Sequence, residues 1–312
     1  MLLYYLLIKP ARSALLFAVL LGDDRSLQRI NIHLGQLLVL YVLYVLPRCF
    51  ITNLASVGTT GHAEMTSALM TATGGGDFGL LTNNAGFKLT GLYHIYVTGM
   101  TSLFNYGDHG PNKFSTTANS MIFYGSVYQQ PVYTLFQRDR YDASEPWSMF
   151  WYDPTVDGAW WDGLALDHIF QDPSDLWGSF RSSWTDNTGM YMALKAGALL
   201  NHQAHGDLDA GTFVIDAMGQ RFAGEYGSGD YLSANYFSNE TQTSQRWSYY
   251  RTMTEGQNVI AINGQNQDVT AQPTLIKGES SGTQQGSSTV LDVPSDSTAY
   301  MVVDLSTAYG GQ

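Results

Sequence analysis

Residues 201–217 read NHQAHGDLDAGTFVIDA, a polar stretch that runs directly into an apolar strand pattern. Two histidines and two aspartates stand in the polar part, although the whole chain has only 7 histidines. Imidazoles and carboxylates held at the start of a strand can transfer protons, bind a metal ion, or do both. We therefore expect function to centre on this stretch, with a strand over 213–217 behind it.

The composition is that of a globular protein with a substantial core. Its 312 residues are enough for one large domain or two ordinary ones, and 44% of them are hydrophobic. Only 13% are charged, while 20 Tyr, 14 Phe and 7 Trp make the chain rich in aromatic rings. This suits an extracellular protein that stacks rings on sugars, and equally an aromatic β core. We expect the protein to be secreted or extracellular.

Charge and cysteine content exclude several classes of function. The formal net charge of −12 argues against nucleic acid as a partner, and a polyanionic ligand would need a local basic cluster. Cys49 is the single cysteine, which excludes an internal disulfide and a cysteine-ligated zinc site. Because Cys49 stands beside an apolar run, we expect it to be a small buried hydrophobe.

Three segments differ in character. Residues 1–56 are poorly defined: their apolar runs are shorter than the ~18–20 residues of a membrane span, and their charge order departs from a secretory signal. Residues 57–165 have helical patterns, including one over 60–70 that stops at a glycine run (74–76), and long aromatic loops. Residues 166–312 have short strand patterns divided by turn residues. The order, helices and then antiparallel strands, predicts an α+β fold.

The strand patterns of the last segment fall at 179–184, 190–195, 211–217, 220–223 and 258–262. Asn263-Gly264 directly after them is a hairpin-type turn sequence. We find no internal repeat.

Three parts of the second half carry motifs in a fixed order: 201–213, then 221–231 with Tyr236-Phe237 shortly after, then 246–258. In order and spacing they resemble the heparinase II/III-like β domain of polysaccharide lyases and related uronate epimerases. The stretch GMTSLFNYGD over 99–108 also resembles the end of that family's α/α-toroid domain. The resemblance implies a partial α/α-toroid followed by an antiparallel β-sandwich-like domain, with the active cleft between them.

The resemblance implies a lyase that cleaves a uronic-acid-containing polysaccharide by β-elimination: a proton leaves C5 and the bond to O4 breaks. His205 matches the family's catalytic histidine, and Tyr236 is a rougher match to a β-domain tyrosine near the site. His202, Arg246 and Arg251 are candidates for binding the acidic chain, since arginine forks match carboxylates. The alternatives are a uronate C5-epimerase, which shares the proton abstraction, and a catalytically inactive glycan-binding protein or fragment.

The chain departs from the family pattern in two places. Asp207 stands where the family has a metal-binding histidine, and Glu225 and Gln257 take the other two ligand positions. Such an all-oxygen set favours calcium or manganese over zinc, and the alternative is a metal-free hydrogen-bond network. Residues 51–56 read ITNLAS, without the tyrosine that the family's toroid supplies, so the activity of this chain stays open.

Overall fold

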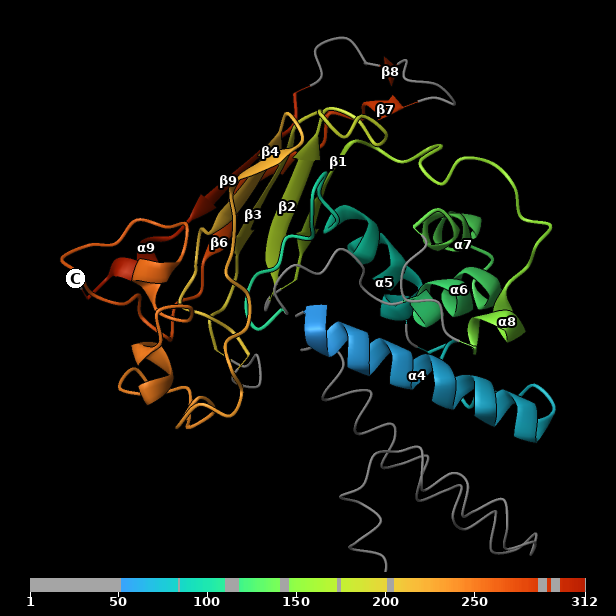
Figure 1. Ribbon diagram of the computed structural model, residues 1–312, viewed down its shortest axis with the longest axis horizontal. Coiled ribbons are helices and arrows are strands. Elements are labelled where there is room, and N and C mark those ends of the chain that lie inside the picture. Colours follow the sequence, from blue (N-terminus) through green and yellow to red (C-terminus); the bar gives the residue numbers. More distant parts are fainter. Residues whose placement is uncertain are drawn as a thin grey trace, which may run out of the picture.

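A helical part and a sheet part lie side by side in the computed structural model of the chain (Figure 1). The structure describes residues 52–83, 85–109, 118–140, 146–172, 175–200, 205–285, 291–292 and 298–311. Most of the N-terminal segment, with Cys49, and His202 of the 201–217 stretch lie outside the described residues. Among the helices that are described, none is both long and apolar enough to span a membrane.

The helical part contains α4 (Thr52–Thr73), α5 (Ala85–Tyr96), α6 (Ala118–Val127), α7 (Pro131–Arg138) and α8 (Ser148–Trp151). The helix predicted over 60–70 is confirmed as part of the longer α4. It ends where Gly74 and Gly75 take positive φ angles of 70° and 111°, and the Gly75 amide donates to the Met70 carbonyl. Helix α7 begins with Pro131, whose fixed φ suits the first helical turn.

The sheet part is built on one antiparallel sheet with the strand order β1-β2-β3-β4-β5. Its strands are β1 (Asp167–Gln171), β2 (Leu176–Arg181), β3 (Tyr191–Ala196), β4 (Phe213–Ala217) and β5 (Gln220–Ala223). A two-residue turn joins β4 to β5, and both of its residues, Met218 and Gly219, have positive φ angles of 54° and 73°. Turns of this kind match the twist of paired strands, so the hairpin follows directly from the local sequence.

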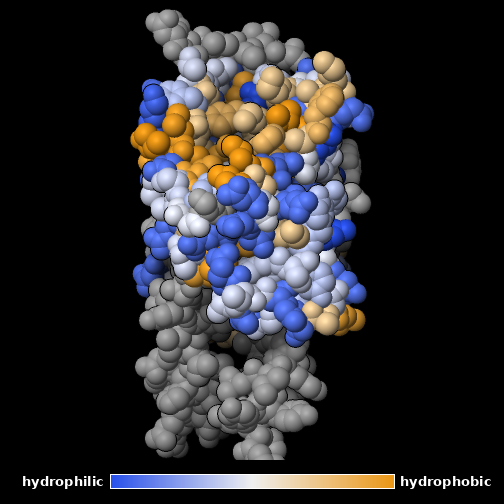
Figure 2. Space-filling model, turned by 90° about the vertical axis from the view of Figure 1, so that its left-hand side faces the viewer, coloured by the Kyte–Doolittle hydropathy of each residue, from blue (hydrophilic) through white to orange (hydrophobic). Residues whose placement is uncertain are grey.

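Shorter elements complete the sheet part: β6 (Thr274–Glu279) pairs with β9 (Tyr300–Asp304), and β7 (Gln284–Gln285) pairs with β8 (Leu291–Asp292). Two 3₁₀ turns, η2 (Gln245–Ser248) and η3 (Thr254–Gly256), and the short helix α9 (Ser306–Tyr309) lie among them. The upper part of the face that carries β4, β6 and β9 is rich in apolar side chains (Figure 2). Phe222 of β5 and Ile276 of β6 are among the exposed apolar residues of these strands.

Three of the five predicted strands are confirmed as β3, β4 and β5, and the strand predicted over 179–184 is confirmed in part, because β2 spans Leu176–Arg181. The prediction of a strand over 258–262 is wrong, because this segment makes only an isolated bridge between Ile262 and Gln265. Its Ile260 side chain is exposed, so the apolar pattern there has no buried face to occupy. The turn at Asn263-Gly264 is confirmed by positive φ angles of 52° and 66°.

The loop after α5 joins the two parts by hydrogen bonds to the β4–β5 hairpin. The Asp216 carboxylate accepts from the backbone amides of Met100 and Thr101 at 2.9 and 3.1 Å. Arg221, paired with Asp216 at 2.6 Å, also donates to the Leu103 carbonyl at 2.6 Å. One buried cluster of apolar side chains contains residues of both parts, such as Tyr93 and Trp177. The mixed α+β prediction is therefore confirmed, with a core shared across the predicted boundary at 165–166.

Candidate active site

Three segments of loop meet at the site: 105–109 after α5, 205–212 between β3 and β4, and 224–257 after β5. Backbone hydrogen bonds join them, from the Asp108 amide to the His205 carbonyl at 2.9 Å and from the Ser228 amide to the His109 carbonyl at 2.7 Å. Gly227 allows the second contact, since its φ is +64° and a Cβ there would lie 2.1 Å from the His109 carbonyl oxygen. Residues far apart in sequence thus share one site.

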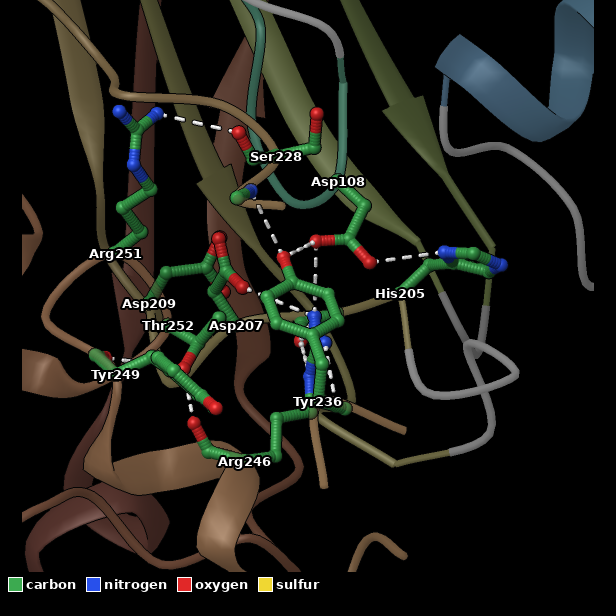
Figure 3. A network of polar contacts seen from close by, with 12 residues as sticks. Asp108, His205, Asp207, Asp209, Ser228, Tyr236, Arg246, Tyr249, Arg251 and Thr252 are labelled. Carbon is green, nitrogen blue, oxygen red and sulfur yellow. Dashed lines mark hydrogen bonds and ion pairs between the residues drawn. The ribbon is translucent and has the colours of Figure 1, made fainter. Parts of the chain in front are cut away.

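A buried carboxylate lies at the centre of the site (Figure 3). Asp108 Oδ2 accepts from His205 Nδ1 at 2.9 Å, and Oδ1 accepts from the Tyr236 hydroxyl and from the Arg246 guanidinium, the latter at 3.1 Å. We call Asp108, His205, Tyr236 and Arg246 the Asp108 cluster. Because a carboxylate only accepts, Nδ1 of His205 carries the proton and Nε2 is the proton acceptor.

His205 is the member of the Asp108 cluster placed to meet a ligand. Its side chain is 17% exposed, whereas that of Asp108 is 1% exposed. The ring packs edge-on against Phe237, with centroids 5.2 Å apart, and its second nitrogen points away from Asp108. The imidazole is therefore fixed on one side and open on the other, which is the arrangement of a general base.

Arg246 lies behind the site and not on its surface. It is fully buried, and it donates to the Gly206 carbonyl at 2.9 and 3.1 Å and to Asp207 Oδ1 at 3.4 Å. Burial alone would lower the pKa of Arg246, but the neighbouring Asp207 and Asp108 outweigh it and the pKa is raised. In this arrangement Arg246 supplies positive charge to the Asp108 cluster and has no exposed atom for direct contact with a polysaccharide.

Arg251 is the more accessible of the two predicted arginines. Its guanidinium donates to the carbonyls of Tyr226 and Ser228 at 2.8 and 3.2 Å. Among the described residues no carboxylate forms an ion pair with it. A guanidinium held by neutral carbonyls keeps its charge available to an anionic ligand.

Tyr236, the predicted catalytic tyrosine, is 2% exposed. Its hydroxyl donates to Asp108 and accepts from the Gly229 amide at 3.0 Å. Burial, and then the hydrogen bond to Asp108, raise the pKa of Tyr236. Tyr236 and His205 thus share Asp108 as a partner, and the Tyr236 hydroxyl is bonded within the protein.

Lys195 and Asp209 form a buried ion pair on the inner side of the site, close to the acidic side chains of Asp207 and Glu225. Lys195 Nζ lies 2.5 Å from Asp209 Oδ1, and both side chains are buried. Burial raises the pKa of Glu225 to about 8, although a hydrogen bond from the Thr212 hydroxyl acts in the opposite direction. Burial also raises the pKa of Asp207, partly offset by Arg246.

The predicted metal ligands are engaged in hydrogen bonds with other groups of the chain. Glu225 contacts the Thr212 hydroxyl, and the Gln257 amide lies 3.5 Å from Asp207 Oδ2 but 2.5 Å from the Arg251 carbonyl. No group of three or more His, Cys, Asp or Glu side chains suited to a metal ion occurs within the described residues. Metal binding by Asp207, Glu225 and Gln257 stays a prediction, and no step below depends on it.

Two residues of the site were not singled out from the sequence. Asp108 ends the 99–108 stretch and Tyr231 ends the 221–231 segment, but neither has a local pattern that marks it as functional. Tyr231 is 39% exposed, and its hydroxyl lies 3.3 Å from His205 Nδ1. Their roles become visible only when loops from three parts of the chain are brought together.

The solved structures similar to this chain include enzymes that degrade heparan sulfate or heparin. The heparan sulfate lyase HepC from Pedobacter heparinus matches with a TM-score of 0.56 and 14% identity, over 83% of this chain and 36% of HepC. Heparinase III matches with a TM-score of 0.46 and 15% identity, over 72% of this chain and 34% of that one. This chain therefore spans about a third of each. No protein-family model and no curated protein matches the sequence. The likeness to HepC supports a heparinase-like fold.

Proposed function

We propose that the chain is a polysaccharide lyase that cleaves a uronic-acid-containing glycan by β-elimination. One observation carries the proposal: buried Asp108 holds one nitrogen of His205 and leaves the other facing outward. The heparinase-like fold, shared with a structure described as a heparan sulfate lyase, supports the same reading. The substrate class is an acidic polysaccharide met outside the cell, in keeping with the predicted secretion.

The chemical difficulty of this reaction is the weak acidity of the C5 proton. In the proposed reaction His205 Nε2 accepts that proton, while Asp108 stabilises the imidazolium that forms. A positive group must also face the substrate carboxylate, because negative charge develops beside it as the proton leaves. Arg251 is our candidate for that group, and Arg246 contributes from behind His205.

The other site residues predicted from the sequence are proposed to have the roles that were predicted for them. Tyr236 is proposed to act beside His205, and His202 is proposed to contact substrate, although it lies outside the described residues. Asp207, Glu225 and Gln257 are proposed as an oxygen-rich set for calcium or manganese. Calorimetric titration of the chelator-treated protein with either ion tests this set, and absence of binding heat would leave the set as a hydrogen-bond network.

The test is to incubate the protein with heparan sulfate, alginate and glucuronan and to follow the ultraviolet absorbance of the unsaturated product. A lyase raises this absorbance. A C5-epimerase exchanges the C5 hydrogen with deuterium from the solvent without raising it, and an inactive glycan-binding protein does neither.

His205→Gln is the variant that links the activity to the site. Loss of the base is expected to lower turnover by roughly 10²–10⁴-fold. His168→Gln is the matched control, since His168 lies on β1, stacked on Tyr96 with centroids 4.9 Å apart, and away from the Asp108 cluster. Full turnover in His205→Gln would refute the assignment of the base.

A further inference from the structure

We propose that Tyr226 and Tyr250 form a site that stacks on the sugar whose carboxylate faces Arg251. The site favours uronates whose ring substituents are all equatorial. It rests on the proposed function, because it takes an acidic polysaccharide as the ligand. The two tyrosine side chains are 52% and 53% exposed, and their rings meet edge to face with centroids 5.8 Å apart. Neither hydroxyl forms a hydrogen bond within the part of the chain that the structure describes.

The backbone around Tyr250 holds its ring at the surface. The Thr252 amide donates to the Tyr249 carbonyl at 3.0 Å, which closes a β-turn. Tyr250 and Arg251 are the two central residues of this turn. Thr252 is buried, and its hydroxyl donates to the Arg246 carbonyl at 2.5 Å, so the turn is anchored to the protein interior.

Arg251 joins Tyr226 to the same surface. Its guanidinium donates to the Tyr226 carbonyl at 2.8 Å, and its Cζ atom lies 5.7 Å from the centroid of the Tyr226 ring. The guanidinium also donates to the Ser228 carbonyl, close to the Asp108 cluster (Figure 3). A cation and a pair of aromatic rings are therefore adjacent to one another and held by the backbone.

A uronate ring carries the groups that such a surface binds. Its carboxylate matches the planar fork of a guanidinium. The C–H bonds of the sugar form apolar patches on the faces of the ring, and tyrosine offers a large, rigid apolar surface with a polar tip. We therefore place the carboxylate at Arg251 and one face of the same sugar on Tyr226 and Tyr250.

Ring configuration decides which uronates can stack in this way. In β-glucuronate every ring substituent is equatorial, so both faces present only C–H bonds. In α-guluronate the oxygens at C3 and C4 are axial and point to opposite faces, so each face carries a polar group. Burial of such an oxygen against an aromatic ring would leave it without a hydrogen bond, which costs binding free energy. Glucuronate chains are thus expected to bind more tightly than guluronate chains.

The test measures affinity in the His205→Gln background, in which the ligand is not expected to be consumed. Glucuronan and polyguluronate oligosaccharides of equal length are compared by calorimetric titration, and the glucuronan oligosaccharide is expected to bind more tightly. Tyr226→Leu and Tyr250→Leu are each expected to weaken its binding by roughly tenfold, as loss of one aromatic contact predicts. Both variants should keep the melting temperature, because the side chains removed are exposed.

Two controls separate stacking from other effects. Tyr250→Phe keeps the ring and is expected to keep the affinity within a few-fold. Trp147 and Phe150 are a second exposed aromatic pair, at α8 in the helical part, with ring centroids 6.0 Å apart. Trp147→Leu and Phe150→Leu are expected to leave the affinity unchanged.

Four results would overturn the proposed site. They are equal affinity for the two oligosaccharides, no loss of affinity in Tyr226→Leu and Tyr250→Leu, an equal loss in Tyr250→Phe, and an equal loss in the variants at α8. The proposed lyase function fails differently. A protein that binds glucuronan through the two tyrosines, but in its wild-type form makes no unsaturated product from any uronate polymer, would refute the lyase and leave the site standing.

Discussion

At the scale of single residues, the carboxylate of Asp108 fixes three other side chains. Asp108 accepts hydrogen bonds from His205, Tyr236 and Arg246, so the orientation of the imidazole, the position of the ring and the buried charge depend on each other. In a buried network of this kind, removal of one member leaves the remaining groups without partners.

Asp108→Asn is the substitution that tests this dependence. An amide keeps the shape of the side chain but lacks the charge that holds His205 Nδ1–H and offsets Arg246, so kcat is expected to fall by roughly 10²-fold or more. Breaking the buried ion pair is also expected to cost about 3–5 kcal/mol of unfolding free energy, measured by denaturant unfolding. Asp167→Asn is the control: it alters a buried carboxylate of β1 that accepts from Ser281. It should lower stability alone, and an equal loss of kcat in both would contradict the specific role of Asp108.

Glu225 gives the site a pH-dependent stability. Its folded-state pKa is raised by burial from 4.5 to about 8, so the folded state binds more protons than the unfolded state between these values. The unfolding free energy is therefore expected to fall as pH rises through this range. Glu225→Gln should flatten that part of the stability curve, whereas Glu255→Gln, at an exposed position, should leave it unchanged. A wild-type curve that rises from pH 5 to pH 8 and does not change in Glu225→Gln would contradict the raised pKa.

Arg251→Gln tests the proposed contact with the substrate carboxylate. Loss of an accessible guanidinium is expected to raise KM for a uronate polymer by about tenfold, the equivalent of one charge-assisted hydrogen bond. Arg138→Gln is the control, because Arg138 lies on α7 and pairs with Asp139 at 2.8 Å. An unchanged KM in Arg251→Gln would show that the positive group lies elsewhere.

The sequence pointed to His205 through a local pattern, but Asp108 and Tyr231 could not be found in that way. Asp108 stands 97 residues before His205, and Tyr231 stands 26 residues after it, in a loop without regular structure. Hydrogen-bond partners at such separations are set by how three loops pack. Arg246 was predicted to bind the acidic chain, but its guanidinium is buried and pairs with Asp108 and Asp207.

At the scale of elements, short apolar runs bounded by turn residues were enough to predict the strands that pair within the main sheet. In β3 the run Tyr191–Ala196 is mostly apolar, and the strand lies between β2 and β4. Residues 258–262 show a similar run of apolar residues but lie along a loop, where Asn258 donates to the Phe213 and Gly224 carbonyls. Tertiary contacts outweighed local propensity there.

Gly227 and Gly264 provide a test of loop placement at the same scale. Their φ angles are alike, +64° and +66°, but a Cβ at Gly227 would lie 2.1 Å from the His109 carbonyl, while nothing lies within 4 Å of one at Gly264. Both Ala variants carry the strain of a left-handed residue, roughly 1 kcal/mol. Gly227→Ala is expected to lose more stability and also turnover, because it pushes the 224–231 loop away from His109. Equal effects of the two variants on melting temperature and kcat would contradict the close approach.

At the scale of the whole molecule, charge opposes the proposed substrate. A chain with a net charge of −12 repels a polyanion at long range, and the attraction proposed for Arg251 is local. Raising the ionic strength from about 10 to about 150 mM shortens the screening length from roughly 30 to roughly 8 Å. We therefore expect kcat/KM for a uronate polymer to rise over this range and that for a short uronide to change less. A steep fall with salt would indicate an attractive basic surface.

The contact between Asp108 and His205 also has a consequence for synthesis of the chain. The two residues are 97 positions apart, and ribosomes add about 5–20 residues per second, so Asp108 is made roughly 5–20 seconds before its partner exists. Arg246, its cationic partner, is made later still. During that interval Asp108 has been made without the side chains that it binds in the folded protein. The Asp108 cluster can therefore form only after the chain has been synthesised as far as Arg246.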